Sequence, residues 1–254
     1  MKAIIIAAGK GSRLSEQTKD TPKCMLHVGG KPIIEHQMEI FSHHGIKDIA
    51  VIKGYMGHKI NYPQLFEFHN KNYEKNNILG SLMKAEEFLD DDVIVSYSDI
   101  IYSSNVVAAL LQAEEQISAV VDVDWRQKYI GRDSHPESEA EKVRLNGRHE
   151  AIEFGKVVEG CEEEIGEFIG LFKLSKEGAF IFKQAFNSAY SNFRDKPFMR
   201  AAKFEQAYVT DMLSYLISMG EKVHCTVISE EWREIDTEQD LTAARQWIEA
   251  MELL

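Results

Sequence analysis

The chain has 254 residues, of which 44% are hydrophobic and 28% are charged, so it can bury one sizeable core and a small second lobe. Its 29 Lys and Arg residues against 41 Asp and Glu residues give a formal net charge of -12, which argues against broad binding to nucleic acid or to an anionic membrane surface. Any anionic ligand must therefore be met by a local basic pocket.

The first apolar stretch and the cysteines bear on cellular location. Residues 3–8 form an apolar run of six residues, whereas a transmembrane helix needs about 20 residues and a signal peptide about 7–15 in its apolar region. Cys24, Cys161 and Cys225 are widely spaced, which suggests neither a disulfide framework nor a zinc site. We therefore expect a cytoplasmic protein that does not bind a membrane.

The N-terminal half alternates expected strands with expected helices. Residues 3–6 are apolar and rich in β-branched side chains, and they lead directly into a glycine loop, as a buried parallel strand does. The further elements expected in this half are a helix from Pro32 to Gly45, a strand at 48–53, a helix at 78–89, a strand at 93–97, a helix around 106–111 and a strand at 118–123. Strands separated by helices predict a parallel sheet.

The regular alternation breaks in the second half. Residues 124–142 are polar and predict a long loop over the end of the sheet, and such loops are often functional. Asn146-Gly147 is a strong hairpin signal between strands at 143–145 and 151–154. The remaining expected elements are a strand at 168–174, a helix at 208–219, a strand at 224–228 and a C-terminal helix that Thr237 caps three residues ahead of Asp240.

The glycine loop after the first strand reads AAGKGSRL over residues 7–14. A G-x-G at this place offers backbone N–H groups to phosphate oxygens without obstruction by side chains. A dinucleotide fingerprint would need a small residue where Leu14 stands and a helix that begins at once, yet residues 15–22 are polar. A Rossmann dehydrogenase is therefore disfavoured, and a P-loop ATPase is too because the chain lacks a G-x-x-x-x-G-K-[ST] string.

Residues 7–14, followed by Thr21-Pro22-Lys23, resemble the nucleotidyltransferases that join a nucleoside triphosphate to a small phosphorylated acceptor. The resemblance implies that Arg13 and Lys23 are catalytic and neutralise charge as pyrophosphate leaves. The alternative is a pair of solvated surface cations. The nucleotide-binding residues that the resemblance implies are Ala7, Ala8, Gly9, Lys10, Gly11, Ser12, Asn77, Ser81 and Ser98.

Two aspartates stand at predicted ends of strands. Asp99 follows the strand at 93–97, at the sheet edge where open α/β folds bind ligands, and Asp236 stands between a strand and the last helix. Either could simply cap a helix. The pair resembles the two family aspartates that hold Mg²⁺ against the triphosphate, and such oxygen ligands suit Mg²⁺. The metal would polarise the α-phosphorus, and a phosphate or phosphonate nucleophile would need no general base.

Asn77 and Ser81 lie where this family recognises the base, and their amide and hydroxyl groups suit the donor and acceptors of cytosine. The alternative for Asn77 is that it caps the following helix. Within the superfamily the resemblance is closest to small cytidylyltransferases that act on phosphocholine, 2-aminoethylphosphonate and related compounds. The stretches that carry this closer resemblance are 96–101, 121–126, His135-Pro136, 139–141, Gly155-Lys156 and 166–170.

Three aromatic residues, Trp125, Tyr129 and Trp232, lie in or beside the loops of the expected site. With Asp122 or Glu167 they could enclose an ammonium group of the acceptor. The alternative is that each aromatic residue packs in the core. The expected acceptor-binding residues are Trp125, Glu167, Trp232 and, for the acceptor's phosphate, Lys156.

These patterns and the resemblance together predict a Rossmann-like, mostly parallel sheet flanked by helices, with a small β-rich acceptor-binding portion. Residues 1–254 would form one domain, with 1–123 and 206–254 as the nucleotide-binding core and 124–205 as the acceptor-binding portion. The expected reaction transfers CMP from CTP to a small phosphorylated or phosphonate acceptor and releases pyrophosphate, with Mg²⁺ as cofactor. Alternatives are a sugar-1-phosphate nucleotidylyltransferase using UTP, dTTP or GTP, and an inactive nucleotide sensor. The sequence leaves open whether the chain forms a homodimer.

Overall fold

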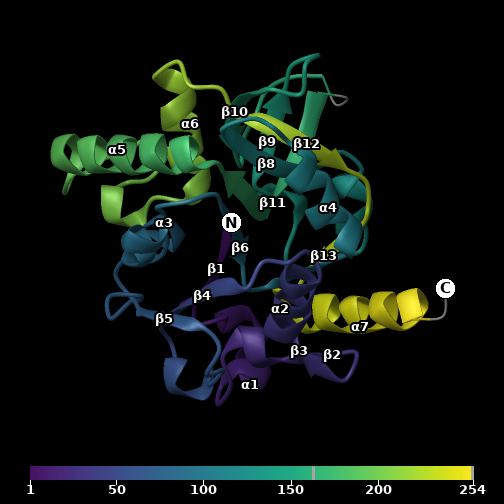
Figure 1. Ribbon diagram of the computed structural model, residues 1–254. Helices are drawn as coiled ribbons and strands as arrows, with labels where there is room; N and C mark the ends of the chain where they lie inside the picture. The colour runs from purple at the N-terminus through teal and green to yellow at the C-terminus, as the bar shows by residue number, and fades with distance from the viewer. Residues whose placement is uncertain (162–163, 253–254) are drawn as a thin grey trace.

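A nine-stranded sheet runs through the centre of the computed structural model, which describes residues 1–161 and 164–252 (Figure 1). The order along the main path is β10-β9-β11-β6-β1-β4-β5, and β8 joins β12 to β11 beside that path. The strands are β1 (Lys2–Ala7), β4 (Asp48–Lys53), β5 (Phe66–His69), β6 (Val93–Tyr97), β8 (Ile117–Asp122), β9 (Lys142–Leu145), β10 (Ala151–Gly155), β11 (Ile165–Leu174) and β12 (His224–Ile228).

Most strands of the sheet point the same way. β1 pairs in parallel with β4 and β6, β4 with β5, and β8 with β12, whereas β11 is antiparallel to β6, β8 and β9, and β10 is antiparallel to β9. Only β11 and β10 therefore run against the others. This arrangement confirms the predicted mostly parallel α/β sheet.

Helices cover both faces of the sheet, as β1 illustrates. Ile4 and Ile6 belong to one buried cluster with side chains of α3, α5 and α6, while Ile5 belongs to a second cluster with side chains of α2 and α4. Burial on both faces explains why this strand is continuously apolar. The helices are α1 (Ser15–Thr18), α2 (Ile33–His43), α3 (Ile78–Leu82), α4 (Ser104–Gln112), α5 (Lys176–Phe193), α6 (Val209–Ser218) and α7 (Glu238–Glu252).

Two helical regions differ from the sequence-based expectation. The helix predicted at 78–89 is the short α3 followed by a 3₁₀ helix at Met83–Phe88, with non-helical backbone at Ala85. The 18-residue α5 was not predicted, because small residues such as Ala179, Ala185 and Ala189 form part of its buried face and weaken the hydrophobic pattern. Ser175 caps α5 by accepting a hydrogen bond from Gly178 N at 3.0 Å.

The long strand β11 bends midway, and this bend shapes the site. Its N-terminal half pairs with β9 and its C-terminal half with β6, with an irregularity between Phe168 and Phe172 against β8. Gly170 has a φ of +82°, and a Cβ there would lie 2.5 Å from Cδ2 of Tyr97. The strand can therefore turn from one neighbour to the other only because residue 170 lacks a side chain.

Residues 124–205 contribute strands to the same sheet as the rest of the chain, namely β9, β10 and β11, together with α5. The expected hairpin is present as β9 and β10, joined by a loop in which Asn146 N donates to Glu150 O. The expected loop at 124–142 contains two short 3₁₀ helices, Trp125–Tyr129 and Glu137–Glu139.

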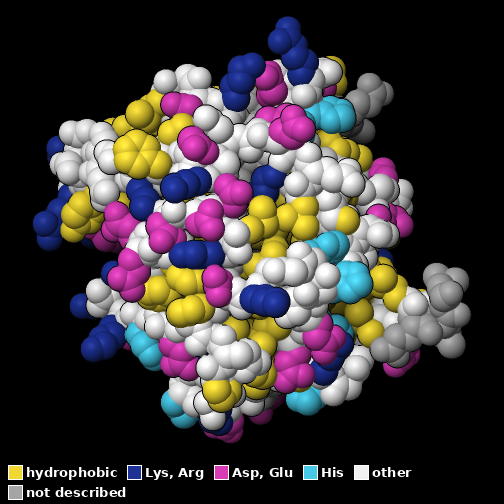
Figure 2. Space-filling view, in the orientation of Figure 1, with side chains coloured by type: hydrophobic (Ala, Val, Ile, Leu, Met, Phe, Trp, Pro, Cys, Tyr) yellow, Lys and Arg dark blue, Asp and Glu magenta, His cyan; other side chains and the backbone are white. Residues whose placement is uncertain are grey.

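Charged side chains of both signs are interspersed over the face shown in Figure 2 and do not gather into one extended basic area. Within the described residues, no helix combines the length and the apolar character that crossing a membrane would need.

Candidate active site

The glycine loop and Asp99 lie together because their strands are parallel neighbours. The register of β1 and β6 pairs Ile6 with Tyr97, so residues 8–11 and 98–99 leave adjacent strands at the same edge of the sheet. Gly11 has a φ of +61°, and a Cβ on it would lie 3.2 Å from Cβ of Lys23. The loop is thereby packed closely against the segment that carries Lys23.

A small two-stranded ladder brings Asp236 to Asp99. Strands β7 (Ile100–Tyr102) and β13 (Trp232–Glu234) are antiparallel, with Ile100 opposite Glu234. The ladder is extended by Ile235 N, which donates to Asp99 O at 2.9 Å. Two carboxylates that are far apart in the sequence therefore converge at one point.

Lys23 lies between these two carboxylates. Its Nζ donates to Asp99 Oδ2 at 2.8 Å and also to Asp236 Oδ1. Burial opposes the charge of Lys23, but the charges of Asp99 and Asp236 and their hydrogen bonds outweigh it, so the pKa of Lys23 is raised. Burial likewise opposes the charge of Asp236, yet Lys23 and His135 hold its pKa well below the ordinary value. Lys23 and Asp236 therefore carry opposite charges at neutral pH.

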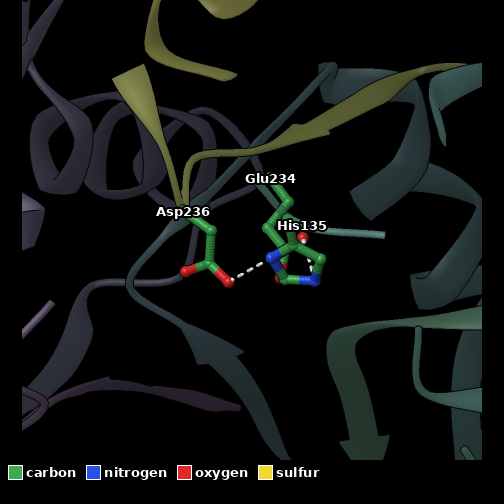
Figure 3. A group of neighbouring side chains, drawn as sticks. All are labelled: His135, Glu234 and Asp236. Atoms are coloured by element: carbon green, nitrogen blue, oxygen red, sulfur yellow. Dashed lines mark ion pairs between the residues drawn. The ribbon is translucent and has the colours of Figure 1, made fainter. Parts of the chain in front are cut away.

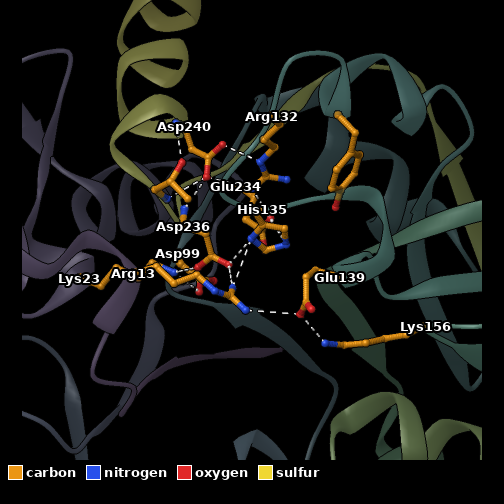
Figure 4. Close-up of polar contacts among 12 residues, drawn as sticks. Arg13, Lys23, Asp99, Arg132, His135, Glu139, Lys156, Glu234, Asp236 and Asp240 are labelled. Atoms are coloured by element: carbon orange, nitrogen blue, oxygen red, sulfur yellow. Dashed lines mark hydrogen bonds and ion pairs between the residues drawn. The ribbon is translucent and has the colours of Figure 1, made fainter.

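A chain of polar contacts continues from Asp236 across the site (Figure 4). Arg13 Nη1 donates to Asp236 Oδ2 at 2.6 Å, and Arg13 Nη2 lies 3.4 Å from Glu139 Oε2. The same oxygen of Glu139 accepts from Lys156 Nζ at 2.6 Å. Three of the cations predicted to meet phosphate, Arg13, Lys23 and Lys156, therefore lie along one line of side chains.

The loop at 124–142 supplies His135 to this cluster. Figure 3 shows His135 beside Asp236 and Glu234, and its Nδ1 lies 2.8 Å from Asp236 Oδ2. The loop is tied down by Arg132, which donates to Asp240 at 2.6 and 2.9 Å and to Glu234 at 2.7 Å. Thr237 Oγ1 accepts from Asp240 N at 3.2 Å, which confirms the predicted cap at the start of α7, and Asp240 Oδ2 accepts from Thr237 N at 2.8 Å.

A cavity opens beside the glycine loop. Its wall contains most of the residues predicted to bind nucleotide, while Lys10 is largely exposed and pairs with Glu74 at 3.8 Å. The lining residues are Ile6, Ala8, Gly9, Gly11, Lys23, Tyr73, Asn76, Asn77, Ile78, Ser81, Tyr97, Ser98 and Asp99.

The polar groups of this cavity are already ordered by contacts with one another. Asn77 caps α3 by accepting from Ile78 N at 2.8 Å and donates to Gln206 O at 3.2 Å, so the capping interpretation is confirmed. Asn70 Nδ2 donates to Asn76 Oδ1 at 2.8 Å and to Ser81 Oγ at 2.9 Å. The contact of Asn77 and Ser81 with a base stays a prediction.

A second cavity adjoins the first and shares Asn77, Ile78, Tyr97 and Asp99 with it. The bend of β11 forms one wall and the 124–142 loop another. The residues that line this cavity but not the first are Arg13, Ile100, Tyr129, His135, Glu139, Ala140, Glu141, Lys156, Glu167, Phe168, Ile169, Gly170, Tyr208, Trp232, Glu234 and Asp236.

The structure places the predicted acceptor-binding residues in two environments, the wall of the second cavity and the protein core. Glu167, Trp232 and Lys156 line the second cavity. Trp125 is completely buried, packs with Tyr129 in a small cluster and donates its Nε1–H to Ile165 O at 3.1 Å. Trp125 therefore packs in the core, as the alternative interpretation states, and it packs against the ring of Tyr129.

Several side chains of the site escaped the sequence analysis as functional candidates, among them Arg132, Glu141 and Tyr97. Arg132 stands in a polar loop where neither periodicity nor a motif marks it. Glu141 and Tyr97 fall in the stretches 139–141 and 96–101 that carry the family resemblance, but neither residue was given a role of its own. The one signal that could have pointed to them is their position at strand ends or in the loop over the sheet edge.

The fold and the site define a nucleotidyltransferase. The family model of the MobA-like NTP transferase domain matches residues 3–234, so the chain belongs to this family. The predicted family is thereby confirmed.

Among curated proteins, the CTP:phosphoglutamine cytidylyltransferase of Campylobacter jejuni is 34% identical over 253 residues, which cover 95% of this chain and 98% of that protein. The structure of a CTP:phosphocholine cytidylyltransferase from Streptococcus pneumoniae aligns with a TM-score of 0.73 at 22% identity, covering 97% of this chain and 98% of that one. An inositol-1-phosphate CTP transferase from T. maritima aligns with a TM-score of 0.72 at 20% identity, covering 96% of each chain. The two structural likenesses concern the fold alone.

Proposed function

We propose that this protein transfers CMP from CTP to a small phosphorylated or phosphonate acceptor and releases pyrophosphate. The observation that carries the proposal is the meeting of two cavities at Asp99, beside Lys23, Arg13 and Asp236. One cavity adjoins the glycine loop and suits a nucleotide, and the other suits a second substrate. The names of the relatives support CTP as the nucleotide.

Positioning and charge would supply most of the catalysis. With CTP on the glycine loop, an anionic oxygen of the acceptor attacks the α-phosphorus from the second cavity. A new P–O bond forms to the acceptor, the bond between the α-phosphorus and the bridging oxygen breaks, and pyrophosphate leaves with that electron pair. Arg13 and Lys23 neutralise the charge that develops on the phosphates. No proton has to be removed from the nucleophile, because its oxygen is already ionised.

Asp99 and Asp236 fit a divalent cation. Both carboxylates converge on the single ammonium group of Lys23, so one positive centre can contact both. Their oxygen atoms are the hard ligands that Mg²⁺ prefers, together with substrate phosphates. When bound there, Mg²⁺ would polarise the α-phosphoryl group and offset charge on the phosphates.

Lys156 is the proposed partner of the acceptor's phosphate, since it lines the second cavity and is half-exposed beside Glu139. We also propose a cytoplasmic location, in keeping with Cys24, Cys161 and Cys225, which are unpaired.

The test is pyrophosphate release with Mg²⁺ across CTP, UTP, GTP, ATP and dTTP. Each nucleotide is paired with phosphoethanolamine, 2-aminoethylphosphonate, phosphocholine, phosphoglutamine and hexose 1-phosphates. We expect CTP with an acceptor bearing an amine or amide to dominate. Turnover confined to hexose 1-phosphates with UTP, dTTP or GTP would move the protein to the sugar-nucleotide branch.

A further inference from the structure

The wall of the second cavity contains more carboxyl groups than cations. Its Lys and Arg residues are Arg13 and Lys156. An incoming phosphate is repelled by ionised carboxylates and attracted by these two cations. The part of the wall that suits the acceptor's phosphate is therefore the space between Arg13 and Lys156. The residues that bring a carboxyl group to the wall are Asp99, Glu139, Glu141, Glu167, Glu234 and Asp236.

The carboxylate of Glu139 already occupies the space between the two cations (Figure 4). Glu139 Oε2 accepts from Lys156 Nζ at 2.6 Å and lies 3.4 Å from Arg13 Nη2. The hydrogen bond from Lys156 lowers the pKa of Glu139, and the charges of Lys156 and Arg13 act in the same direction. One carboxylate oxygen therefore sits where an oxygen of a phosphate would meet both cations.

This space adjoins the place of the proposed reaction. Arg13 stands just after the glycine loop, and its other terminal nitrogen, Nη1, donates to Asp236 Oδ2 at 2.6 Å. Asp236 in turn shares the ammonium group of Lys23 with Asp99. An anion held between Arg13 and Lys156 would therefore lie beside the proposed metal ligands.

The contacts of Glu139 are weak enough to be exchanged for those of a ligand. The side chains of Arg13, Glu139 and Lys156 are 47%, 35% and 41% exposed, and ion pairs at such positions add little net stability. A phosphate brings more charge and more oxygen atoms than one carboxylate, so it can meet both cations more strongly. The loop that carries Glu139 stays anchored meanwhile, because Arg132 binds Asp240 at 2.6 Å.

We infer, on the basis of the proposed function, that Glu139 occupies the subsite of the acceptor's phosphate and is displaced when that phosphate binds between Arg13 and Lys156. Glu139 is thereby an internal competitor of the acceptor. Every anion that uses this subsite binds only the fraction of molecules in which Glu139 has left it, so the apparent affinity for each anion is lowered by the same factor.

Binding of inorganic phosphate tests the inference without requiring the identity of the acceptor. The first cavity is saturated with Mg²⁺ and the α,β-methylene analogue of CTP, which cannot release pyrophosphate, so that added phosphate is directed to the second cavity. In calorimetric titrations we expect Glu139→Gln to bind phosphate about 3- to 10-fold more tightly than the unaltered protein, between the effects of an exposed ion pair and of a hydrogen bond to a charged group. Unchanged or weaker phosphate binding would overturn the inference.

Glu137→Gln is the matched control. Glu137 lies in the same 3₁₀ helix, pairs with Arg126 at 3.8 Å and with Lys142 at 3.9 Å, and does not line the second cavity. Phosphate binding by this variant should equal that of the unaltered protein.

Lys156→Met removes one of the two cations and should weaken phosphate binding. Adding Glu139→Gln to this variant should have a smaller effect than it has in the unaltered protein, because the two side chains act on the same subsite. An undiminished effect in the absence of Lys156 would contradict a subsite between Arg13 and Lys156.

Steady-state kinetics with CTP and the best acceptor gives a second readout. Glu139→Gln should lower KM for the acceptor by the same factor as the dissociation constant of phosphate, with a smaller effect on KM for CTP. A rise in KM for the acceptor would show that Glu139 contacts the acceptor directly and would overturn the inference. Failure of the CTP analogue to bind, or absence of CTP turnover with every acceptor, would instead contradict the proposed function.

Discussion

At the scale of single residues, Lys23 organises the site. Its ammonium group holds Asp99 and Asp236 together, although these carboxylates come from the end of β6 and from the turn before α7. Two like charges that converge on one point would repel each other without the cation between them. Lys23 lowers the pKa of Asp236, and we propose that it also meets phosphate.

Replacing Lys23 by Met removes the charge and keeps most of the volume. We expect pyrophosphate release to fall by at least about 10²-fold, the usual loss when a charge that stabilises the transition state is removed. The measurement is kcat with CTP and the best acceptor at saturating Mg²⁺.

The matched control for Lys23→Met is Lys31→Met. Lys31 lies on β3 (Lys31–Pro32) and pairs with Glu39 on α2, and neither residue lines the two cavities. Its activity should equal that of the unaltered protein. Retention of full activity by Lys23→Met would contradict the role assigned to Lys23.

At the scale of elements, the bend of β11 forms one wall of the second cavity. The strand pairs with β9 before Gly170 and with β6 after it. Tyr97, which lies against Gly170, lines both cavities. A substitution at residue 170 should therefore disturb both the strand pairing of the sheet and the two cavities proposed to hold the substrates.

Gly170→Ala should be destabilising for two reasons, its positive φ and the clash with the Tyr97 ring. Gly30 is the matched control, because its φ is +84° but a Cβ there would meet nothing within 4 Å. We expect Gly30→Ala to lower the free energy of unfolding by about 1 kcal/mol, and Gly170→Ala by about 1–3 kcal/mol more. Urea denaturation measures the free energy of unfolding of both variants. Equal losses would show that the close approach of Tyr97 to residue 170 does not affect stability.

The elements that sequence patterns predicted are those with regular apolar periodicity. The strands β1, β4, β6 and β12 and the helices α2 and α4 were predicted in this way. Patterns could not reveal the ladder of β7 and β13, because each strand is only three residues long, or the three-way pairing of β11, which depends on tertiary contacts. The same limit applies to the site: Asp99 and Asp236 were paired only through the family resemblance, because the patterns themselves do not show that β7 and β13 bring them together.

At the scale of the whole molecule, the buried carboxyls make stability depend on pH. The pKa of Glu167 is about 8 and that of Glu141 about 7, above the about 4.3 of a Glu in an unfolded chain. Between these values the folded state binds more protons than the unfolded state, so the free energy of unfolding falls as pH rises from about 4.5 to 8.

Removing one of these groups should flatten this dependence. Around Glu167 lie Tyr129, Glu234, Lys128 and Arg132, all of which remain in Glu167→Gln. We expect the variant to be more stable than the unaltered protein at pH 8.5, by on the order of 1–3 kcal/mol, and the difference to vanish near pH 4.5. Denaturation at a series of pH values provides the measurement, and a constant difference across that range would show that the carboxyl is not perturbed in the fold.

The central claim is that CMP is transferred and not merely released. The most direct measurement is mass spectrometry of the product formed from CTP, Mg²⁺ and phosphoethanolamine, with pyrophosphate quantified in the same reaction. The account predicts a product in which CMP is joined to the acceptor through its phosphate, in amounts equal to the pyrophosphate, and no product when the acceptor or Mg²⁺ is withheld. Free CMP with pyrophosphate, formed equally well without acceptor, would contradict it.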